Sequence, residues 1–154
     1  MSFAAFRRYA NSVGIALGPG DGPSPEEQRS DYESGIVRLP DGLWRLRTAR
    51  VTPTKPGAFA AVWERGEDGR TRPLQASDGI RGLLVFVEDG ERFGVFRFTS
   101  ADLVRLGVAR TGSQQGKRGF RLYPAWCSDL NPAARRTQRE QAPSFTSLAE
   151  PQRA

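Results

Sequence analysis

The chain has 154 residues and a formal net charge of +6, which suits one domain and favours anionic partners. It contains no histidine, which excludes Ser-His-Asp triads, Cys-His dyads and imidazole metal sites. Its one cysteine, Cys127, excludes a disulfide framework. No apolar run reaches the length of a membrane span, so we expect a soluble, cytoplasmic protein without a membrane partner.

The first part of the chain predicts a helix, a linker and three strands. Apolar residues at helical spacing indicate a helix over 3–13, and the breaker-rich segment 18–25 predicts a linker. The strands expected in this half cover 32–39, 43–51 and 58–65. A Pro-Asp-Gly turn joins the first two into a hairpin. In the second strand, alternation places Trp44 and Leu46 on one face and Arg45 and Arg47 on the other.

The second part predicts three further strands and two helices. The strands expected here cover 82–87, 92–98 and 118–123. The first of them, GLLVFV, is apolar on both faces and should lie at the centre of the sheet. Thr99 or Ser100 can cap a helix over 100–106, and Asn131 followed by proline begins a helix over 132–141.

These elements predict a single α+β domain, with an antiparallel or mixed sheet of five to six strands and about three helices. The domain is expected over 31–141. Residues 1–30 would form an N-terminal helix and linker. Residues 142–154 would form a flexible C-terminal tail, because that segment lacks apolar periodicity. Nucleotide folds with a βαβ rhythm, a GxGxxG segment or a P-loop are not supported by this sequence.

Basic residues gather in two stretches that contain no acid. Residues 43–55 include Arg45, Arg47, Arg50 and Lys55, and residues 110–121 include Arg110, Lys117, Arg118 and Arg121. Only two of the 23 basic residues are lysines, one in each stretch. An ammonium group is compact and flexible, whereas a guanidinium is planar, so lysine is not interchangeable with arginine. We therefore expect both lysines to contact a ligand. If they share one site, they should lie at neighbouring loop ends. The alternative is two ordinary surface lysines.

Four segments together resemble one known family. They are RTARVTPTKPGAFAAVWER, GVFRF, GKRGFRLYPAW and NPAARRTQREQ. In this order they are similar to the MepB-like family, named after a gene beside a multidrug exporter, over Tyr32 to Gln141. The chain departs from the family pattern at Ala58, where a glutamine is typical, and at Glu140, where an aromatic residue is frequent, while Phe59 is kept. The resemblance implies nucleic-acid binding and a nuclease-like fold as expectations.

The leading hypothesis is a protein that binds nucleic acid or a nucleotide phosphate through a basic and aromatic surface. Arginine and lysine neutralise phosphates, and exposed aromatic rings stack on bases. Tyr123 and Trp126 are the favoured aromatics, because Pro124 takes the chain off the strand between them. The candidate binding residues are Arg47, Arg50, Lys55, Lys117, Arg118, Arg121, Tyr123, Trp126 and Gln138.

Two alternatives stay open. The first is a Mg²⁺-dependent nuclease with a PD-(D/E)xK-like fold, in which Glu33 and Asp78 would hold the metal beside a lysine. Against it, Pro40-Asp41 lies in a turn with no E-x-K after it, Glu33 could instead pair with a buried arginine, and Asp78 could cap a turn. The second is a closed pocket for a small anionic ligand, with Glu33 and Gln138 inside it. The sequence identifies no cofactor with certainty, and Mg²⁺ is expected only if the nuclease alternative holds.

Overall fold

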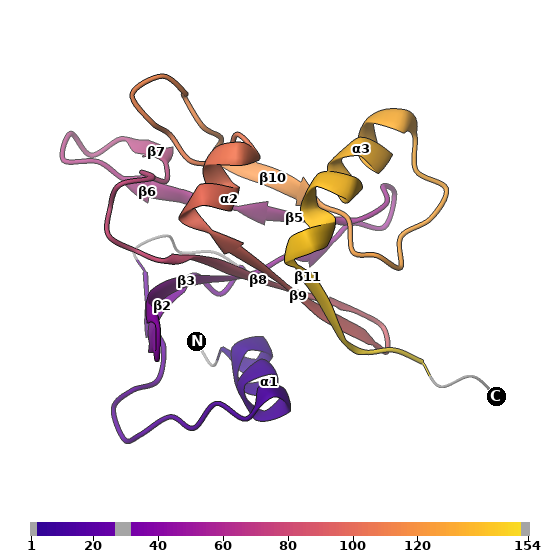
Figure 1. The fold of residues 1–154 in the computed structure, drawn as a ribbon, viewed down its shortest axis with the longest axis horizontal. Coiled ribbons are helices and arrows are strands. Elements are labelled where there is room, and N and C mark those ends of the chain that lie inside the picture. The colour runs from indigo at the N-terminus through magenta and orange to yellow at the C-terminus, as the bar shows by residue number, and fades with distance from the viewer. Residues whose placement is uncertain (1–2, 27–31, 152–154) are drawn as a thin grey trace.

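The structure, a computed structural model, describes residues 3–26 and 32–151. Its largest element is a six-stranded sheet in the order β1-β2-β3-β8-β9-β11 (Figure 1). The strands are β1 (Ser24–Pro25), β2 (Gly35–Leu39), β3 (Gly42–Thr48), β8 (Gly82–Asp89), β9 (Arg92–Thr99) and β11 (Phe145–Ala149). β3 and β8 run parallel and the other neighbours antiparallel, so the sheet is mixed. The predicted α+β class is confirmed.

β8 lies inside this sheet, between β3 and β9, as its uninterrupted apolar sequence predicts. Leu84 and Phe86 point to one face, where they pack with α1 (Ala4–Val13). Leu83 and Val85 point to the other face and join a second cluster. Both faces of β8 are therefore buried, which explains why apolar residues occupy every position from 83 to 87.

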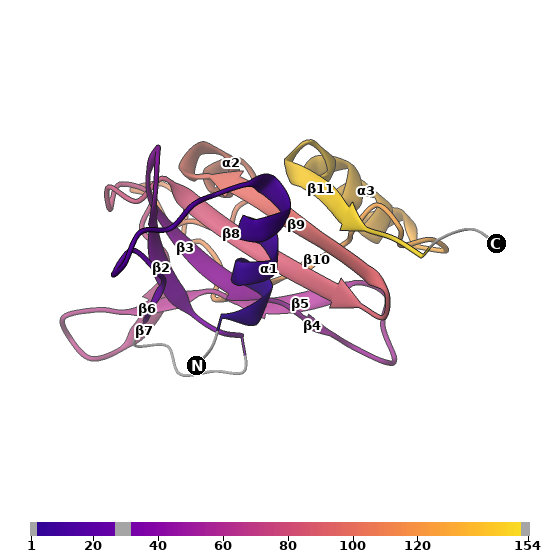
Figure 2. The same ribbon diagram turned by 90° about the horizontal axis from the view of Figure 1, so that it is seen from below.

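A three-stranded sheet covers the face of the large sheet opposite α1 (Figures 1 and 2). It has the order β10-β5-β4, and its strands are β4 (Arg50–Val51), β5 (Ala58–Ala61) and β10 (Gly119–Leu122). A two-stranded hairpin follows β5, formed by β6 (Trp63–Arg65) and β7 (Thr71–Pro73). The predicted strand over 43–51 is thus divided at Ala49, where the chain leaves one sheet and enters the other.

The predicted helices form where capping residues favour them. In α2 (Ser100–Arg105), the Thr99 hydroxyl accepts from the Asp102 N–H and the Asp102 carboxylate accepts from the Thr99 N–H. In α3 (Pro132–Gln141), the Asn131 side chain accepts from the Ala134 N–H at 2.8 Å. A short 3₁₀ turn, η1 (Ala142–Ser144), follows α3. Among the residues described here, no helix has the length and apolar character needed to cross a membrane.

The prediction of a flexible tail from residue 142 is wrong for residues 142–149. After η1 the chain forms β11, which pairs antiparallel with β9. The Phe145 ring lies 4.8 Å from the Phe96 ring and 5.5 Å from the Trp126 ring, measured between centroids. β11 is a short edge strand without alternating apolar residues, so local sequence gave no signal for it. The N-terminal helix also packs against the large sheet, in one core cluster with it. Residues 27–30 of the predicted N-terminal region lie outside the described residues.

Candidate phosphate-binding surface

The outer face of the three-stranded sheet brings the two acid-free stretches together. In β10, Phe120 and Leu122 are buried against the large sheet, so Arg121 points outward, as the alternation of this strand predicts. Arg121 lies opposite Phe59 of β5, which in turn lies opposite Arg50 of β4. We call this face, with the loops at its two ends, the outer basic face. No Asp or Glu occurs over 43–63 or 103–128, the stretches that supply its strands.

Arg121 joins the two motif segments. Its Nη1 donates to the Thr52 hydroxyl at 3.0 Å and to the Pro56 carbonyl at 3.1 Å, both in the β4–β5 loop. The loop turns tightly at Gly57, whose φ is 82°. A Cβ at Gly57 would lie 2.4 Å from the Leu122 carbonyl oxygen and 2.9 Å from the Tyr123 ring. The TPTK loop therefore lies directly against the end of β10.

Two glutamines of α3 hold the C-terminal end of β10 in place. The Gln141 side chain is buried, donates to the Arg121 carbonyl at 2.9 Å and accepts from the Tyr123 N–H at 3.0 Å. Its amide thus substitutes for a neighbouring strand. Gln138 donates through Nε2 to the carbonyls of Pro124 and Cys127, at 3.0 and 3.1 Å. Gln138, a predicted ligand contact, has its donor group engaged in the scaffold.

Arg47 does not lie on this surface, contrary to the prediction. Its side chain is 0% exposed, because β5 covers this part of β3, and its Nε donates to the Ala61 carbonyl at 3.1 Å. The Glu26 carboxylate bridges the two arginines of β3, accepting from Arg47 Nη1 at 2.5 Å and from Arg45 Nη1. Burial lowers the pKa of Arg47 more than Glu26 raises it. Burial also acts on Arg45, but Glu26 and Asp78 together raise its pKa above the usual value.

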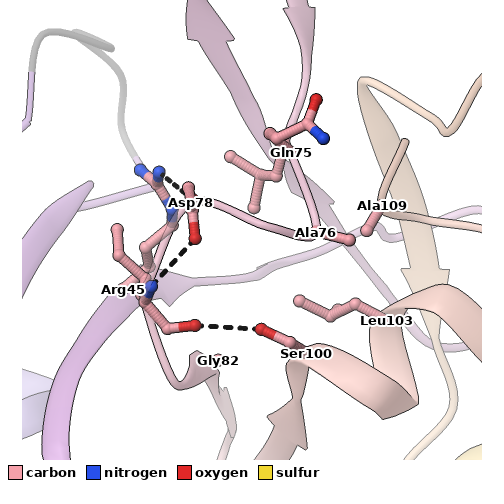
Figure 3. A pocket seen from close by; sticks show the side chains of 10 residues that line it. Arg45, Gln75, Ala76, Asp78, Gly82, Ser100, Leu103 and Ala109 are labelled. Carbon is pink, nitrogen blue, oxygen red and sulfur yellow. Dashed lines mark hydrogen bonds and ion pairs between the residues drawn. The ribbon is translucent and has the colours of Figure 1, made fainter. Parts of the chain in front are cut away.

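The acids proposed for a nuclease site lie in other interactions. Asp78 accepts from Arg45 Nη2 at 2.8 Å and from the Ile80 N–H at 2.9 Å, so it caps a turn as one interpretation predicted (Figure 3). Glu33 accepts from the Thr48 hydroxyl at 3.3 Å and pairs with neither Arg47 nor Arg121. Within 3–26 and 32–151, no group of three or more Cys, Asp or Glu residues is arranged to hold a metal ion.

A small cavity next to Asp78 is lined in part by core residues such as Leu74 and Leu103. It measures about 10 Å³, the space for about one water molecule. Its lining residues include Arg45, Asp78, Ser100 and Leu103 (Figure 3). Ser100 closes one side by donating to the Ile80 carbonyl at 2.9 Å. A phosphate or a metabolite does not fit this space.

The two lysines differ from the other predicted basic residues. Both Lys55 and Lys117 are exposed, and neither ammonium group forms a hydrogen bond or ion pair with another residue that the structure describes. They are not at neighbouring loop ends, because Lys55 lies beyond the Ala58–Leu122 end of the strand pair and Lys117 beyond the other end. At about 3.3 Å per residue, strand geometry separates them by roughly 15–20 Å.

The remaining predicted residues divide between surface and scaffold. Arg118 is exposed but donates through Nη2 to the Thr71 carbonyl at 2.9 Å, which ties β10 to β7. Trp126 packs against the core and Phe145, away from the outer basic face. Arg50 is exposed and Tyr123 is half-buried, both at this face.

Phe59 belongs to this surface and was not among the predicted residues. Its ring covers Gly119, where a Cβ would lie 2.5 Å from Phe59 Cζ, and its centroid is 6.4 Å from that of Tyr32. Its position between the small residues Ala58 and Ala60, which are buried on the opposite face, was the available signal.

Comparison with known proteins identifies the family and the fold. A profile of the MepB-like family matches residues 26–147, which include the three-stranded sheet and both of its motif segments. The chain belongs to the MepB-like family. A solved structure described as the crystal structure of MepB is 28% identical, covers 97% of this chain and 99% of its own, and superposes with a TM-score of 0.83. A search of curated proteins finds no match. The likeness to that structure extends beyond the region that the family profile matches.

Proposed function

We propose that this MepB-like protein binds the phosphates of a nucleic acid on its outer basic face. The observation that carries the proposal is the pair of exposed, uncommitted ammonium groups, Lys55 and Lys117, at the two ends of a strand pair without acids. Phosphate binding by such groups is electrostatic and releases counterions from the nucleic acid.

Arg121 and Phe59 support the same function between the two lysines. Arg121 uses Nη1 to hold the TPTK loop, and a guanidinium has further N–H groups that can donate to a phosphate. Phe59 lies opposite Arg121 on this face, and the Tyr123 ring lies beside Gly57 at its end. Surfaces that bind single strands commonly present aromatic rings of this kind.

The separation of the lysines favours a polymer over a small anion. One strand of B-form DNA carries a phosphate about every 3.4 Å along its axis, so a span of roughly 15–20 Å covers several phosphates. A single mononucleotide cannot reach both ammonium groups. No observation favours the nuclease alternative, because Asp78 is committed to Arg45 and Glu33 to Thr48.

Fluorescence anisotropy with labelled single-stranded and duplex DNA tests the proposal. Lys55→Ala and Lys117→Ala should each weaken binding about equally for all sequences. Each should also reduce the slope of log affinity against log salt, by about 0.9 for duplex and about 0.7 for single strands. Arg38→Ala is the matched control, since Arg38 is an exposed cation on β2 and its loss changes the net charge equally. Unchanged affinity and slope in both lysine variants, or equal losses in the control, would refute the assignment.

A further inference from the structure

The outer edge of β10 is open over a short length between two closed ends. Residues 118, 120 and 122 pair with β5, as the hydrogen bond from the Val62 N–H to the Arg118 carbonyl shows, so 119, 121 and 123 direct their backbone groups away from β5. At one end the Lys117 N–H donates to the Val108 carbonyl at 2.9 Å, and at the other the Gln141 amide takes the Arg121 carbonyl. Between these ends, the N–H and carbonyl of Gly119 and the N–H of Arg121 have no partner among the described residues.

A pocket of about 200 Å³ lies at this open edge. It is smaller than the usual site for a drug-sized ligand. Its walls come from β10, from the segment after α2 and from α3, and the side chains that matter here are Val108, Lys117, Tyr123, Thr137 and Glu140. The strand between Lys117 and Arg121 spans roughly 13 Å, and both ends are blocked. A through-running peptide strand would have to displace Gln141, so the space suits one small group rather than an extended chain.

We infer that this pocket takes one unpaired nucleobase of a single-stranded nucleic acid, an inference that rests on the proposed function. The Gly119 carbonyl offers a hydrogen-bond acceptor, and the neighbouring N–H groups offer donors. The pairing edge of every base carries both donors and acceptors, so it can form hydrogen bonds with these groups. In a duplex these base edges are already occupied, whereas single strands can present them to a protein. Lys117 lines the pocket and also belongs to the outer basic face, so a strand whose phosphate reaches Lys117 brings a base to the opening.

Comparison of a base-containing oligonucleotide with an abasic strand of equal length and charge tests the inference. Both should bind wild-type protein, because both carry the same phosphates. The base-containing strand should bind about tenfold tighter, in the range found for a single base contact. Equal binding of the two strands would overturn the inference and leave phosphate binding intact, whereas no binding of either would overturn both.

A variant that fills the pocket locates the effect. Thr137→Trp places a large ring in the pocket, and should reduce affinity for the base-containing strand to that for the abasic strand without changing the salt slope. Ala133→Trp, at an exposed position one turn earlier on α3, is the control and should retain the preference. Circular dichroism checks that both variants fold, and the comparison of the two strands on wild-type protein stands without them. If folded Thr137→Trp still preferred the base-containing strand over the abasic strand, the inference would be overturned. It would also be overturned if a short extended peptide bound in the pocket more tightly than the oligonucleotide.

Discussion

The bridge formed by Glu26 gives the sharpest stability prediction. Glu26→Gln keeps the shape of the side chain but removes the negative charge between Arg45 and Arg47. Arg45 retains Asp78, whereas Arg47 is 0% exposed and would keep its carbonyl contacts to Leu46 and Ala61. Removing one partner of a buried ion pair costs about 3–5 kcal/mol, because the other charge stays buried with less compensation.

That loss is large relative to the stability of a domain, which is about 5–15 kcal/mol. For a chain of this size, about 2–4 °C of melting temperature accompanies each kcal/mol, so the variant should melt roughly 6–20 °C lower. Urea unfolding followed by tryptophan fluorescence, together with thermal melting, measures the change. The double variant Glu26→Gln/Arg47→Met should recover part of the loss, since it replaces both charges of the Glu26–Arg47 pair.

Glu88→Gln is the matched control for this prediction. Glu88 lies 3.7 Å from Arg8, and both side chains are about half exposed. An exposed pair of this kind contributes about 0–1 kcal/mol, so the control should be nearly as stable as wild type. If Glu26→Gln lost no more stability than Glu88→Gln, the reasoning from burial would be refuted.

Three further changes test the packing of the domain. Gln141→Leu should destabilise the fold by about 1–3 kcal/mol for each backbone group left unpaired, and hydrogen exchange at the Tyr123 amide should accelerate; unchanged exchange would contradict the strand-like role of Gln141. Burial raises the pKa of Asp102, but the hydrogen bonds with Thr99 outweigh it, so the pKa lies below its ordinary value in the folded protein. The ionised carboxylate therefore contributes its full stability above the ordinary carboxyl pKa, and this contribution is lost as pH falls through the pKa of the folded state. Asp102→Asn should therefore be less stable than wild type at neutral pH, and this difference in unfolding free energy should shrink below pH 4. A difference that stays constant with pH would contradict this. Deleting 145–154 should lower the melting temperature by several degrees, since β11 pairs with β9; an unchanged melting temperature would restore the interpretation of this segment as a tail.

Local patterns predicted the elements whose cause is local. A few neighbouring residues are enough to predict the helix caps at Thr99 and Asn131 and the central strand β8. Each of these predictions was confirmed. The alternation around Phe120 and Leu122 likewise gave the correct outward direction for Arg121.

Features that depend on distant parts of the chain could not be predicted. Glu26 meets Arg45 and Arg47 only because β1, just before it, pairs with β2, the neighbour of β3. No spacing in the sequence indicates that contact. The burial of Arg47 has the same origin, since β5 covers β3 only after the chain changes sheets at Ala49. The separation of the two lysines follows from the register of β5 and β10, which pairs Leu122 with Ala58.

Mapping of amide chemical shifts tests the central claim most directly. On addition of a single-stranded oligonucleotide at low salt, the account predicts that the largest shifts cluster in 50–61 and 117–123, and that added salt reverses them. Shifts confined to α1, on the opposite face of the large sheet, and to β2 within that sheet would contradict the assignment of the outer basic face. The absence of any shift at low salt would contradict phosphate binding itself.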